Sequence, residues 1–363
     1  MLVTRVACLR KAAALAGFLA SCLSLGAAAV TVVRTPEIAA MDAGPVWASV
    51  ATWDHAEERI VIADPGSGRI YVYDTGGRVQ RRVENPGRGP LEYTKANYAD
   101  RVGNRYLIAT SSYQWLWFDR DLRATAAWEL DWDTGAPHSR LDTSEFDFTD
   151  THLYTIGATM NFEGKWSDKG VFAVSLKDRG VRRLATFAKD MEEFSFYNEP
   201  PFNLAVCSGQ PWLLKMGPTV SIMEARDNGK RLRSFPAEFQ KRPAIPLLND
   251  ASSVRGRRAA LRNSTIASGL FCSGDRLLLL AHKPRAGGGQ QWLVYPIDPV
   301  QDAMSTPVEL PTTADEIVFV PGQKRWAVLE KGPMKYVGVQ PLVRMISFPR
   351  PAMTPSKANK TAP

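Results

Sequence analysis

The sequence predicts an all-β fold, a six-bladed β-propeller with four antiparallel strands in each blade. Apolar runs of four to six residues, bounded by Gly, Pro or Asp, indicate short strands. A unit built of such runs recurs six times, at spacings of 46 to 64 residues, which is close to the period of propeller blades. The length of 363 residues alone would suggest two domains, but six units fill residues 46–349 as one. Two packed β-sandwiches, the alternative, would not require six matching units.

The second strand of each unit is the most apolar and is therefore the easiest to locate. These second strands begin near Ile60, Tyr106, Leu153, Leu213, Leu277 and Trp326. The third strands follow as RIYVYD, WLWFD, VFAVSL, VSIMEA, WLVYPID and KYVGVQ. Turns such as D-T-G-G-R close most of these hairpins, with Gly supplying a positive φ. Residues 251–262 form the longest helix candidate. Residues 30–45 give either a strand that completes a blade and closes the ring or a terminal linker.

Residues 1–29 have the features of an export signal. Three basic residues precede an uncharged stretch that is rich in Ala, Leu and Val. Ala27–Ala29 offers a cleavage site, whereas the L-A-S-C motif resembles a lipoprotein box that would place a lipid on Cys22. A third interpretation keeps the uncharged stretch as an anchor, because about 20 apolar residues span a bilayer. All three predict an exported protein that is periplasmic, anchored to the outer membrane or secreted.

Only Cys207 and Cys272 remain once the leader is removed. They lie in similar motifs, A-V-C-S-G-Q and L-F-C-S-G-D, which suggests equivalent places in two repeats. Export makes a disulfide chemically possible. Equivalent places in neighbouring repeats can nevertheless lie more than ~7 Å apart between Cα atoms, too far for a bridge. We therefore expect two buried thiols, with a disulfide as the alternative.

The motif G-R-G-P-L-E-Y, residues 87–93, follows the first unit. It resembles the G-x-G-P-G-E-F signature of exported bacterial six-bladed β-propellers, within the broader NHL/TolB-like group. Leu91 replaces a Gly of that signature, and Tyr93 replaces its Phe. The resemblance implies a propeller fold in a bacterial exported protein. Many members of the group have no assigned activity, and a shared fold does not transfer chemistry.

The loops predict which face of the propeller is functional. In a four-stranded blade, the loops between second and third strands emerge on the same face as the connections between blades. In this sequence these are the long segments, residues 131–144, 161–169, 236–267 and 283–291, and we call this face the long-loop face. Binding residues concentrate on loops held by rigid scaffolds. The long-loop face is therefore the candidate functional face.

Basic and aromatic residues on this face predict a site for an acidic partner. Arg forks suit carboxylate or phosphate groups, and aromatic rings can stack on a ring or a sugar. The candidate ligand-binding residues are Arg88, Tyr93, Trp115, Trp166, Arg255, Arg258, Arg262 and Arg285. The partner would be a protein, an anionic glycan or an anionic small molecule. The competing interpretation is a solvated loop surface balanced by acids such as Glu163, Asp168 and Asp250.

Catalytic and metal-binding motifs are not found in the sequence. The four His are far apart and show no metal-binding spacing. No G-x-S-x-G elbow, P-loop or EF-hand loop is present. The polar cluster from Asp54 to Glu58 is interpreted as a turn. Six aromatic residues are interpreted as packing between sheets: Trp47, Trp53, Trp117, Trp128, Trp212 and Trp326. We therefore assign no catalytic residue, no metal and no cofactor.

These observations together predict a binding module at the cell envelope rather than an enzyme. One alternative is a hydrolase or lyase whose site is assembled from separate blades at the propeller axis. The other is a structural component of an envelope assembly. The net charge of +8, three units of which belong to the leader, argues against nucleic acid. We expect a monomer that meets the membrane only through its leader, with a disordered tail at residues 350–363.

Overall fold

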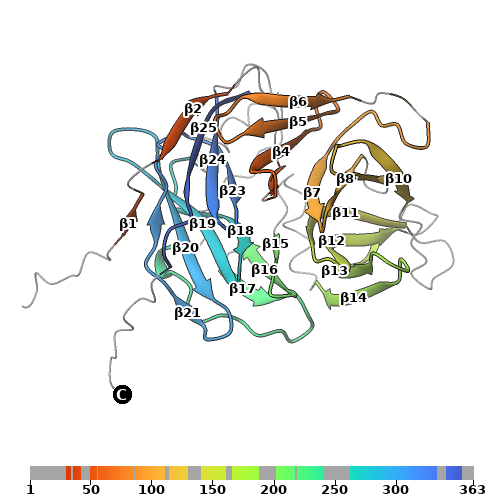
Figure 1. Cartoon of the computed structure of the whole chain (residues 1–363). Coiled ribbons are helices and arrows are strands. Elements are labelled where there is room, and N and C mark those ends of the chain that lie inside the picture. The colour runs from red at the N-terminus through yellow and green to blue at the C-terminus, as the bar shows by residue number, and fades with distance from the viewer. Residues whose placement is uncertain are drawn as a thin grey trace, which may run out of the picture.

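The computed structural model describes residues 30–33, 36–41, 50–54, 56–84, 87, 89–110, 114–129, 140–160, 166–187, 202–216, 219–240, 262–332 and 341–353. These residues form six β-sheets, which Figure 1 shows arranged around a central axis. The all-β, six-bladed propeller predicted from the repeats is confirmed. Each sheet is one blade, and the blades follow one another in chain order.

The first three blades each contain four antiparallel strands. Blade 1 consists of β3 (Val50–Asp54), β4 (Arg59–Asp64), β5 (Arg69–Asp74) and β6 (Val79–Val83). Blade 2 consists of β7 (Tyr98–Val102), β8 (Arg105–Ala109), β9 (Gln114–Phe118) and β10 (Ala124–Glu129). Blade 3 consists of β11 (Arg140–Phe148), β12 (His152–Met160), β13 (Trp166–Ser175) and β14 (Val181–Thr186).

The last three blades are less regular. Blade 4 consists of β15 (Phe202–Cys207), β16 (Gln210–Met216) and β17 (Val220–Glu224). An isolated bridge between Met223 and Arg231 extends this sheet, and the 3-10 helix η3 (Ala237–Phe239) follows it. Blade 5 consists of β18 (Ile266–Ser273), β19 (Arg276–Pro284), β20 (Gln290–Asp298), β21 (Ala303–Met304) and β22 (Val308–Glu309). Blade 6 contains β23 (Ile317–Pro321), β24 (Arg325–Lys331) and β25 (Leu342–Pro349).

Two N-terminal strands join these last blades. β2 (Glu37–Ala40) pairs with β25 in antiparallel register, Ile38 opposite Ile346, and is the outermost strand of blade 6. β1 (Thr31–Val32) pairs with β22 in parallel at the edge of blade 5. The beginning of the described chain thus covers the outer edges of two blades that form near its end. Covering an edge removes unpaired N–H and C=O groups that could recruit another strand.

The predicted second strands are confirmed in all six blades, as β4, β8, β12, β16, β19 and β24. Five of the predicted third strands coincide with β5, β9, β13, β17 and β20. The sixth, K-Y-V-G-V-Q, lies outside the described residues, and the strand that pairs with β24 is β25. The helix candidate at 251–262 also lies outside them, except for Arg262.

The core consists of apolar layers between neighbouring sheets. Trp115 and Trp326, both 0% exposed, are the largest of the fully buried side chains in these layers. Trp115 packs with Leu153 and Phe172 between blades 2 and 3. Trp53, Trp117, Trp128 and Trp212 are also buried. The prediction that tryptophans pack between sheets is thus confirmed for these four and for Trp326, whereas Trp47 lies outside the described residues. Burial of one large apolar side chain stabilises the fold by roughly 1.5–3 kcal/mol.

The expectation of two free thiols was wrong. Cys207 and Cys272 form a disulfide, with their Cα atoms 5.3 Å apart. Cys207 ends β15 and Cys272 lies near the end of β18, and these are the innermost strands of blades 4 and 5. Blades lie closest to one another near the axis, so equivalent positions on innermost strands can come within bridging distance.

Candidate functional site

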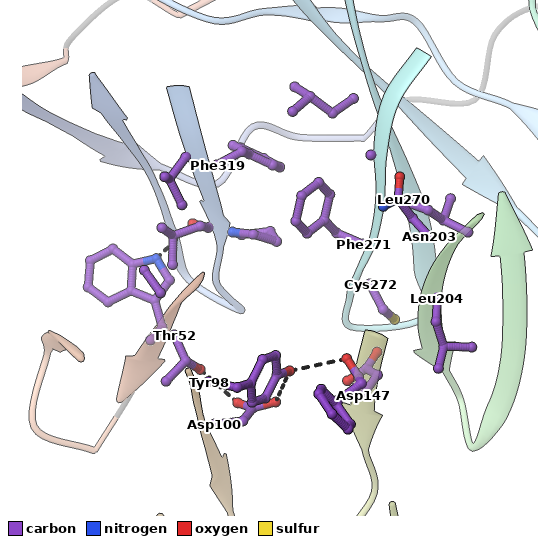
Figure 2. A pocket seen from close by; sticks show the side chains of 18 of the residues that line it. Thr52, Tyr98, Asp100, Asp147, Asn203, Leu204, Leu270, Phe271, Cys272 and Phe319 are labelled. Atoms are coloured by element: carbon purple, nitrogen blue, oxygen red, sulfur yellow. Dashed lines mark hydrogen bonds between the residues drawn. The ribbon is translucent and has the colours of Figure 1, made fainter. Parts of the chain in front are cut away.

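A cavity of about 780 Å³ runs along the propeller axis. Its walls come from β3, β7, β11, β15, β18 and β23, the innermost strands of all six blades. Small residues such as Ala51, Ala99 and Gly269 on these strands keep the centre open. Figure 2 shows the side chains that reach into it. A volume of this size suits a small-molecule ligand.

Asp100, in the middle of β7, presents its carboxylate to this cavity. Oδ1 accepts hydrogen bonds from the Thr52 hydroxyl at 2.8 Å and from the Arg101 backbone N–H at 2.7 Å. Burial raises the pKa of Asp100, and these hydrogen bonds oppose the shift. The three residues come from two blades, so blade packing fixes the position of the carboxylate.

Asp147, on β11, is the second carboxylate of the cavity. It accepts hydrogen bonds from the backbone N–H groups of Phe148, at 2.7 Å, and Val206. These bonds favour the charged form, but burial and the negative charge of Asp100 outweigh them and raise the pKa of Asp147 to about 7. Both carboxylates are surrounded by protein yet touch the cavity. Asp147 can therefore give or accept a proton near neutral pH.

Tyr98 links the two carboxylate-bearing strands. Its hydroxyl lies 3.4 Å from Asp100 Oδ2 and 3.2 Å from the carbonyl oxygen of Phe146, the residue before Asp147. Its ring packs against the Phe146 ring, with centroids 5.4 Å apart. Figure 2 shows Tyr98, Asp100 and Asp147 close together at one part of the cavity. Tyr98 therefore holds the spacing between the acidic positions of blades 2 and 3.

The remaining wall is mainly apolar and aromatic. Leu204, Leu270, Phe271 and Phe319 line it. Figure 2 shows Phe271 and Phe319 in the part of the cavity away from the two aspartates, and Leu204 on the side of Asp147. Asn203 Oδ1 is buried and has no hydrogen-bond partner among the described residues. A buried acceptor of this kind favours a ligand that donates a hydrogen bond. The cavity thus combines apolar surface with a few polar groups, as ligand sites do.

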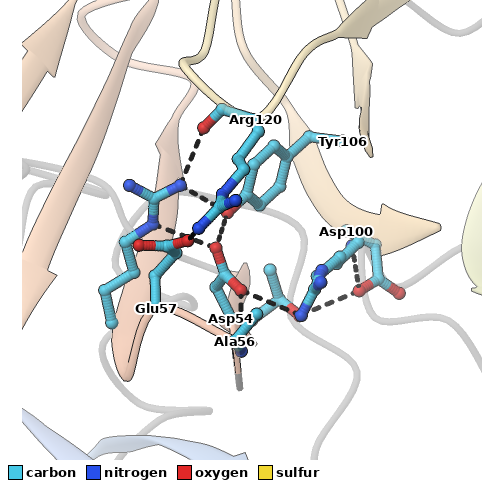
Figure 3. Close-up of polar contacts among 9 residues, drawn as sticks. Asp54, Ala56, Glu57, Asp100, Tyr106 and Arg120 are labelled. Carbon is cyan, nitrogen blue, oxygen red and sulfur yellow. Dashed lines mark hydrogen bonds and ion pairs between the residues drawn. The ribbon is translucent and has the colours of Figure 1, made fainter. Parts of the chain in front are cut away.

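A second buried carboxylate cluster lies outside this cavity, around Asp54 (Figure 3). The Asp54 side chain is 2% exposed and makes ion pairs with Arg59 at 3.0 Å and Arg101 at 2.9 Å. It also accepts hydrogen bonds from the Tyr106 hydroxyl and the Ala56 N–H. These contacts join blades 1 and 2. The prediction that this segment is a structural turn is confirmed for its described residues, which exclude position 55.

The structure places two of the predicted ligand-binding aromatic residues in the core. Tyr93 is 2% exposed and packs edge-to-face on Phe118, with ring centroids 6.1 Å apart. Trp115 is fully buried between blades 2 and 3. Neither ring is exposed to a ligand on the long-loop face. Trp166 begins β13 opposite Met160, and its side chain lies outside the described part of the structure.

The structure brings the predicted Arg262 and Arg285 together at a pocket of about 340 Å³. Arg262 pairs with Asp315 at 3.0 Å, and Arg285 pairs with Glu309. Their charges are thus balanced by acids that lie far away in the sequence. Exposed pairs of this kind contribute only about 0–1 kcal/mol. The other predicted residues of this face, Arg88, Arg255 and Arg258, lie outside the described residues, as does Cys22 of the leader.

The G-R-G-P-L-E-Y motif forms the connection into blade 2. The Glu92 carboxylate accepts a hydrogen bond from the Gly89 N–H at 2.8 Å. A Cβ atom at position 87 would overlap the Glu92 side chain, which explains the glycine. The described residues of the motif therefore shape a tight loop, with Tyr93 anchored in the core below it. They do not line the axial cavity.

The sequence reasoning missed Asp100 and Asp147. Each is an aspartate inside an innermost strand, in Y-A-D-R-V and in F-D-F. Aspartates at strand ends shape turns, but an aspartate within an innermost strand faces the axis or a neighbouring blade. That position in two consecutive repeats was a signal that a search for local motifs does not detect.

Comparisons with known proteins identify the fold and no family. No family model matches the sequence, and no curated protein matches it. A member of the DUF4221 family from Bacteroides vulgatus shares 8% identity with a TM-score of 0.52, over 88% of this chain and 98% of that one. A gluconolactonase from Xanthomonas campestris shares 12%, with a TM-score of 0.49 over 88% and 91%. A Bacteroides fragilis protein described as exported shares 12%, with a TM-score of 0.45 over 89% and 99%. The structural neighbours include six-bladed propeller proteins.

The described residues lack two further features. No group of three or more His, Cys, Asp or Glu among them is arranged to hold a metal ion. Within the same residues, none of the helices has the length and apolar character needed to cross a membrane.

Proposed function

We propose that the protein is an enzyme of the hydrolase or lyase class, with its active site in the axial cavity. The observation that carries this proposal is the convergence of Asp100 and Asp147, from two blades, on one cavity of about 780 Å³. Among the described residues, the contacts that orient the two aspartates are hydrogen bonds, and none of these contacts is an ion pair. Carboxylates held in this way are suited to proton transfer rather than to structural pairing.

The two carboxylates have different surroundings, which suggests different roles. Asp100 is held by donors from Thr52, Arg101 and Tyr98, all of which favour its charged form. Asp147, with a pKa of about 7, exchanges a proton readily at neutral pH. Pairs of acids whose environments differ in this way divide acid and base roles. Asp147 would be the general acid or base, and Asp100 would stabilise positive charge that develops on the substrate.

The lining also limits the substrate class. Aromatic and aliphatic walls favour a ring or another apolar body. Two aspartates near one end disfavour an anion, because a third negative charge in a poorly solvated space is costly. A neutral or cationic small molecule with hydroxyl or N–H donors fits these features best, since Asn203 offers an unpaired acceptor.

A second candidate function is the binding of an acidic partner on the long-loop face. The observation that favours it is the position of Arg262 and Arg285 at one pocket. An anion would have to displace Asp315 and Glu309 from them. We rank this function below the axial enzyme for that reason.

The cellular location of the protein is part of the same proposal. Three observations support an exported, envelope-located protein: the leader at residues 1–29, the resemblance of residues 87–93 to exported bacterial propellers of the NHL/TolB-like group, and the Cys207–Cys272 disulfide. A mass measurement of the N-terminus from a bacterial host tests it. A free N-terminus at residue 30 and a lipid on Cys22 are the two expected products, and an intact leader would instead indicate an anchor.

The enzyme proposal is tested with the purified protein and a panel of neutral small-molecule esters, lactones and glycosides. We expect turnover of one class, and a loss of about 100-fold or more in kcat/KM for Asp147→Asn. Asp121→Asn is the matched control, because Asp121 is an exposed aspartate in the turn between β9 and β10 and does not line the cavity. Equal activity of the Asp147→Asn variant and the control would contradict the proposal.

A further inference from the structure

We propose that Ser268 and His282 form a nucleophile–base pair on the wall of the axial cavity, and that the protein cleaves neutral esters or lactones through an acyl group carried on Ser268. This proposal rests on the axial cavity being a substrate site. It adds residues on β18 and β19, in blade 5, to a cavity whose carboxylates come from β7 and β11.

The pair has the geometry that proton transfer requires. Ser268 Oγ lies 2.8 Å from His282 Nδ1, within the range for a serine and its general base. Ser268 lines the cavity and is partly exposed, whereas His282 is 7% exposed behind it. The serine therefore faces the substrate space, and the base is protected from solvent.

The imidazole is held in place by a fixed aromatic neighbour. The rings of His282 and Trp292 lie 4.7 Å apart at an angle of 49°. Trp292 itself donates a hydrogen bond from Nε1 to the carbonyl oxygen of Ala314 at 2.8 Å. Trp292 also lines the cavity. Packing of this kind limits the ring to one orientation, which a general base needs.

The backbone of β18 is irregular at Ser268. The pairing of β18 with β19 shifts register between Ala267 and Gly269, so Ser268 is the additional residue of a β-bulge. Bulges redirect side chains and are frequent beside active sites. A Cβ atom at position 269 would lie 2.8 Å from the ring of Phe271, so glycine there leaves room for that ring. The strand is thus shaped to bring Ser268 to the cavity.

The chemical step balances without a metal or cofactor. When Nδ1 carries no proton, it accepts the hydroxyl proton while Oγ bonds to the carbonyl carbon of the ester. The bond from that carbon to the leaving oxygen then breaks, and the imidazolium gives its proton to the leaving oxygen. Water attacks the acyl-serine in the same way and restores Ser268. The sum is ester plus water giving acid plus alcohol.

A fluorophosphonate probe tests the pair without knowledge of the substrate. Such a probe phosphonylates an activated serine and releases fluoride. We expect a single adduct on the full chain, located on Ser268 by peptide mass spectrometry. Ser268→Ala should remove it, and His282→Asn should slow its formation at least tenfold. Asp121→Asn, an exposed surface change, is the control that should label like the unmodified protein.

A second variant keeps the test valid if Ser268→Ala does not fold. Ser268→Cys retains a nucleophile, and its thiol should react with iodoacetamide faster in the presence of His282 than in the His282→Asn background. Absence of an adduct on Ser268 in the unmodified protein, or labelling that is independent of His282, would overturn this proposal. The axial enzyme proposal would then still be judged separately, by the effect of Asp147→Asn on turnover of the substrate panel.

Discussion

Two aspartates, the buried Asp54 and the partly exposed Asp147 of the axial cavity, have opposite surroundings. Asp54 lies between two guanidinium groups and a tyrosine hydroxyl, so the two arginines balance its negative charge. Asp147 is oriented by two backbone N–H groups and lies near a second carboxylate. The first arrangement fastens blade 1 to blade 2. The arrangement around Asp147 leaves a carboxylate without a cationic partner among its described contacts. The comparison therefore separates an aspartate that stabilises the fold from one that belongs to a candidate site.

The largest effect is expected for Asp54→Ala. Removal of the carboxylate leaves Arg59 and Arg101 without the partner that neutralises them, and breaking a buried pair costs about 3–5 kcal/mol. Urea denaturation should show that loss in the free energy of unfolding. Asp121→Asn should change it by less than about 0.5 kcal/mol. A loss below about 1 kcal/mol for Asp54→Ala would mean that the contacts of Asp54 do not stabilise the packing of blade 1 against blade 2.

The disulfide on the cavity wall should have the next largest effect. It joins residues separated by 65 positions, and a bridge of that span typically contributes about 2–4 kcal/mol through the unfolded state. The double variant Cys207→Ala, Cys272→Ala should lose that amount in urea denaturation under oxidising conditions. Reductant should produce the same loss in the unmodified protein and no further loss in the variant. A bridge that is absent in solution would make all of these curves coincide.

Asp147→Asn should change how stability depends on pH. The pKa of Asp147 is about 7 in the folded protein, above its ordinary value of 3.8, so the folded state binds more protons between these values. The favourable contribution is complete below about pH 4 and is lost as pH rises through 7. We expect Asp147→Asn to remove this decline and to gain roughly 1–3 kcal/mol relative to the unmodified protein at pH 8. The measurement is the melting temperature of both proteins from pH 5 to pH 8. Parallel profiles for Asp147→Asn and the unmodified protein would contradict a raised pKa of Asp147.

The smallest effect is expected for Tyr98→Phe. The hydroxyl contacts Asp100 and the Phe146 carbonyl, and loss of one such bond costs about 0.5–1.5 kcal/mol. Because this bond lowers the pKa of Asp100, the substitution should move that pKa further upward. Carboxyl carbon chemical shifts measured against pH would detect the change. An unaltered titration of Asp100 would show that Tyr98 acts through packing alone.

The repeats carried most of the fold prediction. Runs such as I-V-I-A-D and L-L-L-L-A located β4 and β19 because a buried second strand is apolar on both faces. The third strand of blade 6 could not be located in this way, because β25 contains Val343 and Arg344 on exposed positions and breaks the pattern. The disulfide was missed because a repeat gives equivalent positions but not their distance from the axis.

The candidate site was harder to predict than the fold. Asp100 and Asp147 lie in different repeats, and only the closure of the ring brings them to one cavity. The arginines of the long-loop face were judged by their own charge alone. Their acidic partners are far away in the sequence: Asp315, in the connection between β22 and β23, pairs with Arg262, and Glu309, in β22, pairs with Arg285. Local charge alone therefore does not show whether an arginine is free to bind an anion, and a search for local motifs does not detect residues that several blades bring together.

The pairing of β2 with β25 also governs the order in which the molecule can be completed. Ile38 meets Ile346, so this contact joins residues about 300 positions apart. Contacts of such long range close slowly, because the entropy of a large loop is lost before they form. Five blades can assemble while the chain is still lengthening, whereas the sixth waits for β25. The β2–β25 contact is therefore the expected late step of folding, and a circular permutant that makes these strands neighbours in sequence should fold faster.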